Sequence, residues 1–247
     1  MPTPDATARP ADPREPLGGL GRLRTVLVTG AASGLGRAVA RAVAEAGGTP
    51  VALDLSASPD GFDGEQVDLA DTASAEAAVE RLAERHGGLT AVVTAAGTDA
   101  CGKLADVERK SWEQVVAVNL LGTAAVVRAA LPHLRASRGT VVTVASTLGL
   151  RALPDATAYS ASKFGVVGFT RALALELAGE IGVTLLVPGG MSTAFFDGRP
   201  DQYKPGPDAQ LNDPANVAAS VLFALRQPPG CEVRELIVTP STEPSWP

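Results

Sequence analysis

Short apolar, β-branched runs alternate with helix-forming stretches along most of this 247-residue chain. Near-continuous apolar strands separated by helices indicate a parallel sheet that is covered on both faces. We therefore predict an α/β fold, in which one domain over residues 23–247 forms a doubly wound parallel sheet. The expected strands are 25–29, 50–54, 65–67, 91–94, 140–145, 184–187 and 235–239.

The helix-forming stretches have recognisable ends. The expected helices cover residues 37–46, about 111–131 and about 157–178, and a last helix begins at Asp213 and Pro214. Pro132 helps to end the second of these, because proline disrupts a helix interior. Residues 1–22 are rich in Pro, Ala, Asp and Arg and show no periodicity, so we expect a flexible tail.

A glycine-rich turn follows the first strand at once and leads into a helix. Gly30, Gly34 and Gly36 have the spacing Gly-x-x-x-Gly-x-Gly, with Ser33 and Leu35 between them. A strand, a glycine turn and a helix N-terminus together present free backbone N–H groups to an anion. The spacing differs from the common Gly-x-Gly-x-x-Gly fingerprint, but its context predicts a phosphate-binding loop.

Asp54 ends the second expected strand, about twenty residues after the glycine loop. A carboxylate at this position accepts hydrogen bonds from a ribose diol and repels a 2′-phosphate. Ser33 and Leu55 are not basic, so neither offers a 2′-phosphate a counter-charge. This pattern favours NAD over NADP as the cofactor.

Tyr159 and Lys163 stand four residues apart in an expected helix, and Ser146 precedes the tyrosine by thirteen residues. Positions i and i+4 share a helix face, so we expect the phenol and the ammonium side by side. A neighbouring cation favours the phenolate, which predicts a Tyr159 pKa lowered from about 10 toward neutrality. Such a tyrosine exchanges a proton with a carbonyl or alcohol oxygen, and a serine hydroxyl holds the same oxygen.

Together these motifs resemble the short-chain dehydrogenase/reductase family, over about residues 23–240. The resemblance implies a Rossmann-type fold and hydride transfer to or from a nicotinamide dinucleotide. It implies that Ser146, Tyr159 and Lys163 are catalytic, and that Asn119, in the helix before the serine strand, anchors a water chain from Lys163.

The resemblance also implies further cofactor contacts, with Asp68 at the adenine ring and the turn after the sixth strand at the nicotinamide. The implied cofactor-binding residues are Gly30, Ser33, Gly34, Leu35, Gly36, Asp54, Asp68, Leu69, Ala96, Gly97, Tyr159, Lys163, Pro188, Gly189, Met191 and Thr193. The chain departs from the family at Thr94-Ala95, where relatives usually have Asn-Asn. The missing asparagine usually supports the central sheet, so its loss concerns local rigidity rather than the chemistry.

Composition and charge exclude several function classes. The net charge of −6 argues against nucleic acid or an anionic membrane as a partner. The sequence has no uninterrupted apolar stretch of about 18 residues and no secretory signal, so we expect a cytoplasmic protein. Neither Cys101 and Cys231 nor His86 and His133 form a metal-binding pattern, so no metal site is predicted.

The sequence constrains the substrate less tightly. The segment from about 191 to 212 corresponds to a mobile substrate lid in relatives, and Phe195 and Phe196 lie in it. Leu148, Leu150 and Leu153 follow the catalytic serine and are expected in the same pocket. Apolar walls predict a neutral, moderately hydrophobic secondary alcohol or ketone. Arg151 is expected on the surface, with pairing to a substrate carboxylate as the alternative.

Two other functions stay open. One is an NADP-dependent ketoreductase acting on 3-ketoacyl or polyketide intermediates, against which Asp54 argues. The other is a dinucleotide-binding sensor without catalysis, against which the complete set of catalytic residues argues. The resemblance further implies a homo-oligomer, a dimer or tetramer, whose subunits pair through the alanine-rich surfaces of 123–130 and 165–178.

Overall fold

The fold is built on a parallel sheet, as the alternation of strands and helices predicts. The computed structural model describes residues 24–228 and 230–246, so the predicted tail at 1–22 lies outside the described residues. Within them, a seven-stranded sheet has the order β3-β2-β1-β4-β5-β6-β7, and every neighbouring pair is parallel. The strands are β1 (Thr25–Thr29), β2 (Thr49–Asp54), β3 (Gly64–Gln66), β4 (Ala91–Thr94), β5 (Thr140–Val144), β6 (Gly182–Pro188) and β7 (Glu235–Val238). All seven predicted strands are present. Two have the predicted bounds, and the ends of the other five differ by at most two residues.

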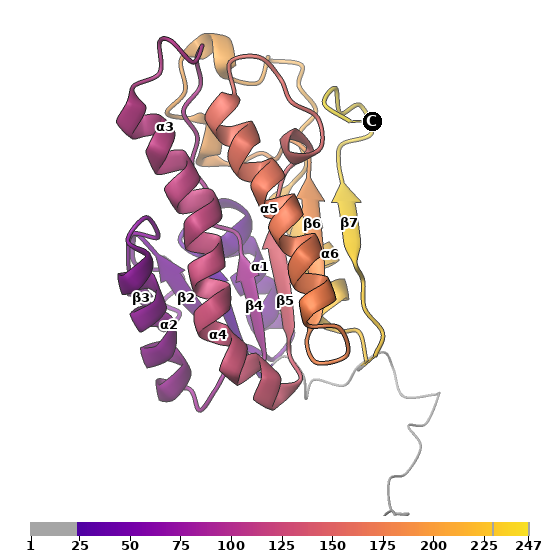
Figure 1. Cartoon of the computed structure of the whole chain (residues 1–247). Coiled ribbons are helices and arrows are strands. Elements are labelled where there is room, and N and C mark those ends of the chain that lie inside the picture. Colours follow the sequence, from indigo (N-terminus) through magenta and orange to yellow (C-terminus); the bar gives the residue numbers. More distant parts are fainter. Residues whose placement is uncertain (1–23, 229, 247) are drawn as a thin grey trace, which may run out of the picture.

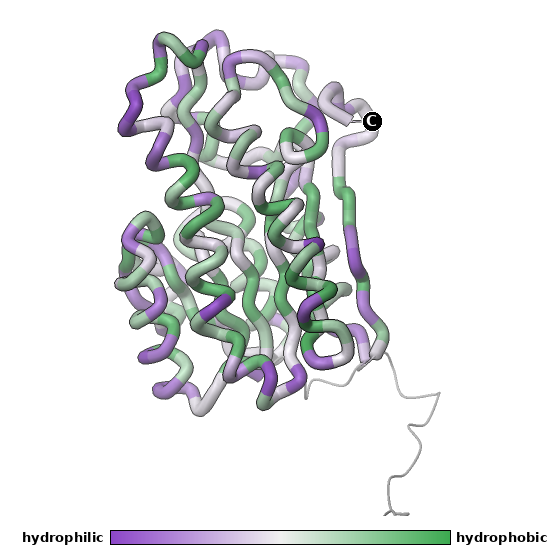
Figure 2. Tube along the Cα trace, viewed as in Figure 1, coloured by the Kyte–Doolittle hydropathy of each residue, from purple (hydrophilic) through white to green (hydrophobic). Residues whose placement is uncertain are grey.

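Helices cover both faces of the sheet (Figure 1). One face carries α1 (Gly34–Glu45) and α6 (Pro214–Leu225), and the other carries α2 (Thr72–Arg85), α4 (Thr123–Ser137) and α5 (Thr157–Glu176). Each layer buries its own apolar cluster against the strands, with Leu27 and Leu53 on one face and Val26 and Val28 on the other. Hydrophobic and hydrophilic residues are interspersed along the helices, as expected where one side of a helix is buried (Figure 2). The doubly wound α/β prediction is confirmed.

The last helix begins as its sequence predicts. The side chain of Asp213 accepts a hydrogen bond from the backbone N–H of Ala215, and Pro214 occupies the first turn. This capping satisfies one of the N–H groups that have no partner inside the helix.

The predicted end of the helix near residue 131 is wrong. One helical run extends from α3 (Arg109–Val116) through a π-helical turn, η2 (Ala117–Gly122), into α4, and Pro132 lies inside α4. The fully buried Ala130 and Leu134 hold the helix on the sheet to either side of the proline. Tertiary packing therefore outweighs the hydrogen bond that proline removes. The helix ends only at Ser137, and Arg138 caps it in the left-handed conformation.

This same run, Arg109–Ser137, is long and apolar enough to cross a membrane by length and composition. Nearly half (44%) of its most apolar window is buried inside the fold, where α4 packs against α2 and the sheet. A core helix passes the same test, so the run is weak evidence for a membrane span.

Candidate active site

A cavity of about 840 Å³ opens at the carboxyl ends of the strands. In doubly wound sheets this is the edge at which ligands bind. The cavity is lined by the predicted residues Gly30, Ser33, Gly34, Leu35, Asp54, Asp68, Leu69, Ala96, Gly97, Ser146, Leu148, Leu153, Tyr159, Lys163, Pro188, Gly189, Met191, Thr193, Phe195 and Phe196. Gly36 and Asn119 do not line it, and both lie directly behind its wall.

The glycine loop is shaped by close backbone contacts. Gly30 has a φ of +70°, and a Cβ there would lie 2.8 Å from Cα of Ala96. A Cβ on Gly36 would collide with the carbonyl oxygen of Gly30. Ser33 precedes α1 without capping it through its side chain, so N–H groups at the helix start keep no side-chain partner. The loop is therefore a backbone cradle of the kind that accepts a phosphate.

Asp54 is held at the end of β2 by two backbone donors. Its carboxylate accepts hydrogen bonds from the N–H of Ala32 in the glycine loop, at 3.0 Å, and from the N–H of Ser56, at 2.9 Å. Arg37, which follows the loop, makes a two-pronged ion pair with Asp60, at 2.7 and 2.9 Å. The fixed charge that faces this part of the cavity is therefore the carboxylate of Asp54.

Tyr159 and Lys163 both line the cavity from α5, as their spacing predicts. The Nζ atom of Lys163 lies 5.6 Å from the centre of the Tyr159 ring and donates a 2.9 Å hydrogen bond to the carbonyl oxygen of Val144. Burial raises the pKa of Tyr159 to about 12, and a hydrogen bond with Ser146 opposes that shift only in part. The predicted lowering of this pKa by Lys163 is wrong, because burial of the phenol dominates and Lys163 is not among the groups that shift it.

Lys163 is itself affected by burial. Only 4% of this residue is exposed, and burial lowers the pKa of its ammonium to about 8. Lys163 remains mostly protonated at neutral pH and retains a charge that a nearby oxygen can use.

Asn119 connects the elements that surround Lys163. It lies in the π-helical turn, is fully buried, and exchanges two hydrogen bonds with the backbone of Thr98, at 2.8 and 2.9 Å. Its Nδ2 also donates to Oγ of Ser162 on α5, at 3.0 Å. Asn119 thus ties the loop after β4 to the helix that carries Tyr159 and Lys163. The π-helical turn itself is a feature often found at functional sites.

The departure at Thr94 has a visible consequence. The Oγ1 atom of Thr94 is buried and has no hydrogen-bond partner among the described residues. The adjacent support comes instead from Thr29, whose Oγ1 accepts a 3.0 Å hydrogen bond from the N–H of Ala96. The loop after β4 is thereby still tied to β1.

Only some of the residues predicted for the substrate pocket line the cavity. The Phe195 ring packs 5.7 Å from the Tyr159 ring, and Leu148 and Leu153 line the cavity as predicted. Leu150 does not: it packs against the buried cluster of Ala145, Val166 and Leu185, which corrects its placement. Arg151 does not line the cavity either.

Arg199 and Asp99 are site residues that the sequence reasoning missed. They form an ion pair of 2.6 Å, with side-chain exposures of only 18% and 6%. The guanidinium lies over the rings of Phe195 and Phe196, at 4.8 and 4.7 Å from their centres. No local pattern links the two residues, since they stand 100 positions apart in the sequence.

The predicted lid segment, 191–212, is fastened over the cavity by this pair and by a second contact. It contains two short 3-10 turns, Ala194–Phe196 and Asp201–Tyr203, and a bridge joins its ends at Met191 and Asn212. The hydroxyl of Tyr203 donates a 3.2 Å hydrogen bond to Asp155, just before α5. The segment therefore contacts both the loop after β4 and the residues just before α5.

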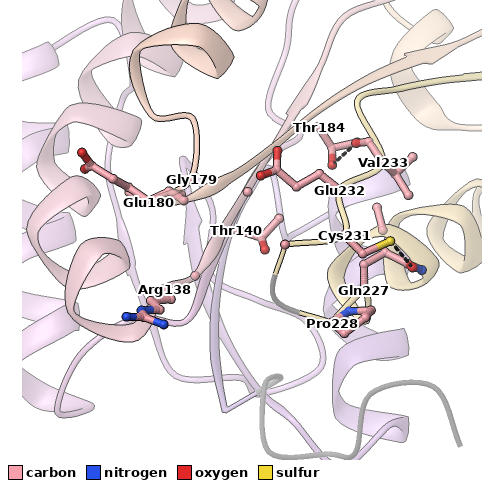
Figure 3. A pocket seen from close by; sticks show the side chains of 15 residues that line it. Arg138, Thr140, Gly179, Glu180, Thr184, Gln227, Pro228, Cys231, Glu232 and Val233 are labelled. Atoms are coloured by element: carbon pink, nitrogen blue, oxygen red, sulfur yellow. Dashed lines mark hydrogen bonds between the residues drawn. The ribbon is translucent and has the colours of Figure 1, made fainter. Parts of the chain in front are cut away.

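A second cavity of about 230 Å³ lies at the amino ends of β5 and β6, opposite the ends that border the first cavity. Arg138, Glu180 and Cys231 are among the residues that line it (Figure 3). It contains none of the predicted site residues, so it is not the site for the chemistry that the motifs indicate. Among the described residues, no group of three or more His, Cys, Asp or Glu side chains is placed to hold a metal ion.

Comparisons with known proteins agree with this geometry. The family profile of the short chain dehydrogenases matches residues 24–204. The chain is 30% identical over 219 residues to the 3-oxoacyl-(acyl-carrier-protein) reductase FabG of Thermotoga maritima, covering 81% of this chain and 89% of that protein. It is 33% identical over 252 residues to the glycine betaine reductase ATRR of Emericella nidulans, covering 94% of this chain but only 19% of that much longer protein.

A solved structure shares the fold. The ligand-free aldohexose dehydrogenase of Thermoplasma acidophilum aligns with a TM-score of 0.78 and 24% identity, over 87% of this chain and 92% of that chain. At this identity the likeness bears on the fold alone.

Proposed function

Because the chain belongs to the short chain dehydrogenase family, we propose that this oxidoreductase transfers a hydride between NAD(H) and a secondary alcohol or ketone. One observation carries the proposal: the glycine loop, Asp54, Ser146, Tyr159 and Lys163 line a single cavity. A dinucleotide that lay along the glycine loop would therefore extend toward the hydroxyl of Tyr159.

The residues present fit a nicotinamide dinucleotide. The backbone cradle of the glycine loop suits a pyrophosphate. Gly97 leaves open space beside Lys163, since a Cβ there would lie 3.7 Å from Nζ. The bound dinucleotide would accept or supply the hydride. We assign the adenosine side to Asp54, Asp68 and Leu69, and the nicotinamide side to Pro188, Gly189, Met191 and Thr193.

Asp54 supports NAD as the preferred cofactor. Its carboxylate would accept hydrogen bonds from the ribose diol and repel a 2′-phosphate. The pair that Arg37 makes with Asp60 removes a nearby cation that could have offset the repulsion.

Tyr159 would move the proton at the substrate oxygen. With a pKa of about 12, its hydroxyl is protonated at neutral pH and is ready to donate to a carbonyl oxygen that gains a hydride. Alcohol oxidation needs the deprotonated tyrosine, so this direction should speed up as the pH rises. Ser146 would hold the substrate oxygen, and the ammonium of Lys163 would hold the nicotinamide ribose.

The substrate we propose is neutral and moderately hydrophobic. Arg199 lines the cavity and its charge is neutralised by the ion pair with Asp99, while Leu148, Phe195 and Phe196 supply apolar contacts. A second candidate is a 3-ketoacyl or polyketide-type reductase using NADP. The similarity to the 3-oxoacyl-(acyl-carrier-protein) reductase of Thermotoga maritima favours the 3-ketoacyl substrate of this candidate.

We also propose a dimer or tetramer. The outer side of α5 exposes Phe164 (45%) and Leu175 (81%), and Leu121 beside it is 52% exposed. Large apolar side chains at this exposure on neighbouring helices suit a contact with a second copy. Light scattering that gives only a 25.1 kDa particle would refute the oligomer.

The test of the function is cofactor reduction with a panel of secondary alcohols, and the reverse assay with ketones. NAD and NADP are compared for the wild type and for Tyr159→Phe. We expect turnover with NAD that falls by about 10²- to 10⁴-fold in the variant, while NAD affinity stays within about twofold. A Phe variant that keeps most of its activity would remove Tyr159 from the mechanism, and a preference for NADP would favour the second candidate.

A further inference from the structure

The segment that follows β7 returns to the cavity. Figure 1 places the C-terminus at the end toward which the β6 and β7 arrows point. Glu243, Pro244 and Ser245 line the same cavity as Tyr159 and the glycine loop. Ser245 is only 4% exposed, so this segment is packed into the site rather than lying loosely over it. We call residues 240–246 the C-terminal strap.

The strap is fastened to two loops that carry site residues. Oε2 of Glu243 accepts a 2.9 Å hydrogen bond from the N–H of Gly190, in the turn after β6. The Oγ of Ser245 lies 2.7 Å from Oγ1 of Thr147, the neighbour of Ser146, and shares a hydrogen bond with it. The strap thus bridges the loop after β5 and the turn after β6.

Gly189 makes room for the carboxylate. A Cβ at this position would collide with Oε2 of Glu243. The turn after β6 therefore offers the N–H of Gly190 as a donor and, at Gly189, the space for the Glu243 carboxylate. These two features fix the carboxylate at the cavity wall.

Within the described part of the chain, Glu243 is an anion without a cationic partner. Burial raises its pKa, but hydrogen bonds from the hydroxyl and N–H of Ser245 and from the N–H of Gly190 outweigh that effect and hold the pKa below its usual range. Over residues 24–228 and 230–246, no cation makes an ion pair with it. All three donors are neutral groups, so the full negative charge remains at the wall.

We infer that Glu243 makes the site prefer the oxidised form of the nicotinamide. This rests on the proposed function, in which the turn at Pro188–Gly190 borders the ring. The oxidised ring carries a positive charge and the reduced ring does not, so an unpaired carboxylate attracts only the former. Because both forms share every other group, the carboxylate changes their relative affinity rather than dinucleotide binding in general.

Equilibrium binding tests the inference without any substrate. Calorimetry at pH 7.5 gives the Kd of NAD⁺ and of NADH for the wild type and for Glu243→Gln, which keeps an oxygen acceptor but loses the charge. We expect the variant to bind NAD⁺ about fivefold to tenfold more weakly, with the Kd of NADH changed by less than about twofold.

Two control variants separate charge from packing. Ser245→Ala loosens the strap without changing its charge, so it should weaken both forms by a similar factor. Glu235 lies at the start of β7, and its exposed carboxylate pairs with Arg171. Glu235→Gln removes that carboxylate and should leave both Kd values unchanged. These controls show whether the redox preference belongs to the charge of Glu243.

The outcomes distinguish this inference from the proposed function. If Glu243→Gln weakens NAD⁺ and NADH equally, the strap has a structural role only and the inference is overturned while the proposed function stands. If the wild type binds neither form, the proposed function and the inference fall together. A selective loss of NAD⁺ affinity supports both.

Discussion

Arg199 and Asp99 are joined by a 2.6 Å ion pair beside Tyr159, although one belongs to the lid segment and the other to the loop after β4. Both charges act on the tyrosine: Asp99 raises the pKa of Tyr159 and Arg199 lowers it. The pair therefore joins the 191–212 segment to the loop after β4 and at the same time acts on the pKa of Tyr159.

Removing either charge of this pair should move the pH profile of alcohol oxidation, in opposite directions. In the proposed reaction, oxidation requires deprotonated Tyr159, so its rate should rise with pH. Asp99→Asn removes a charge that raises the pKa, and the profile should move to lower pH by up to about one unit. Arg199→Gln should move it to higher pH. Steady-state kcat from pH 6 to 11 measures this, and shifts in the same direction would show that the pair acts through lid packing instead.

Lys163 should make the stability of the protein depend on pH. Its folded pKa of about 8 lies below the ordinary value of 10.5, so between these values the unfolded chain binds more protons. The stability of the wild type relative to Lys163→Met should therefore rise with pH from about 8 to 10.5, by on the order of 3 kcal/mol in total. Urea unfolding at pH 7.5 and pH 10 measures the difference.

Lys110→Met is the matched control for that series, because Lys110 is exposed at the start of α3. The difference in free energy of unfolding between Lys110→Met and the wild type should be the same at both pH values. A Lys163 difference that does not change with pH would mean that the ammonium is not penalised by burial.

Gly36→Ala should damage the glycine loop. A Cβ at this position collides with the carbonyl of Gly30, so we expect NAD⁺ affinity to fall at least about tenfold and stability to fall by about 1–3 kcal/mol. Gly168→Ala places the same methyl group where a Cβ meets nothing within 4 Å, in the middle of α5. That change should stabilise the protein by about 0.5–1 kcal/mol. Thermal unfolding and NAD⁺ titration compare the two, and equal effects would contradict the close approach at Gly36.

Asp54→Asn should weaken the preference for NAD. The change removes the repulsion of a 2′-phosphate, so the ratio of kcat/KM for NAD to that for NADP should fall at least about tenfold. Asp68→Asn removes a charge elsewhere in the same cavity and should change the ratio by less than about threefold. If both variants change it alike, the selectivity comes from the overall charge of the cavity and not from a ribose contact.

The sequence by itself determined the fold and the location of the site. Apolar strands that alternate with helices can bury themselves only as a covered parallel sheet, and the carboxyl ends of parallel strands meet at one edge. Gly30, Asp54 and Ser146 lie at or just after the ends of three such strands, so their convergence could be predicted without coordinates. The i and i+4 spacing likewise placed Tyr159 and Lys163 on one face of a helix. These inferences rest on short-range periodicity, which can be read directly from the sequence.

Tertiary structure alone decided the electrostatics of the site. The pKa of Tyr159 is set by burial, by the hydrogen bond with Ser146 and by the charges of Asp99 and Arg199, and burial depends on how distant segments pack. The same is true of Pro132, which remains inside a helix because its neighbours are buried on the sheet. Glu243 has no local motif that marks it, and it reaches the cavity only because the chain returns to the turn after β6. Contacts between residues far apart in the sequence leave no periodic signal, so only the folded chain reveals them.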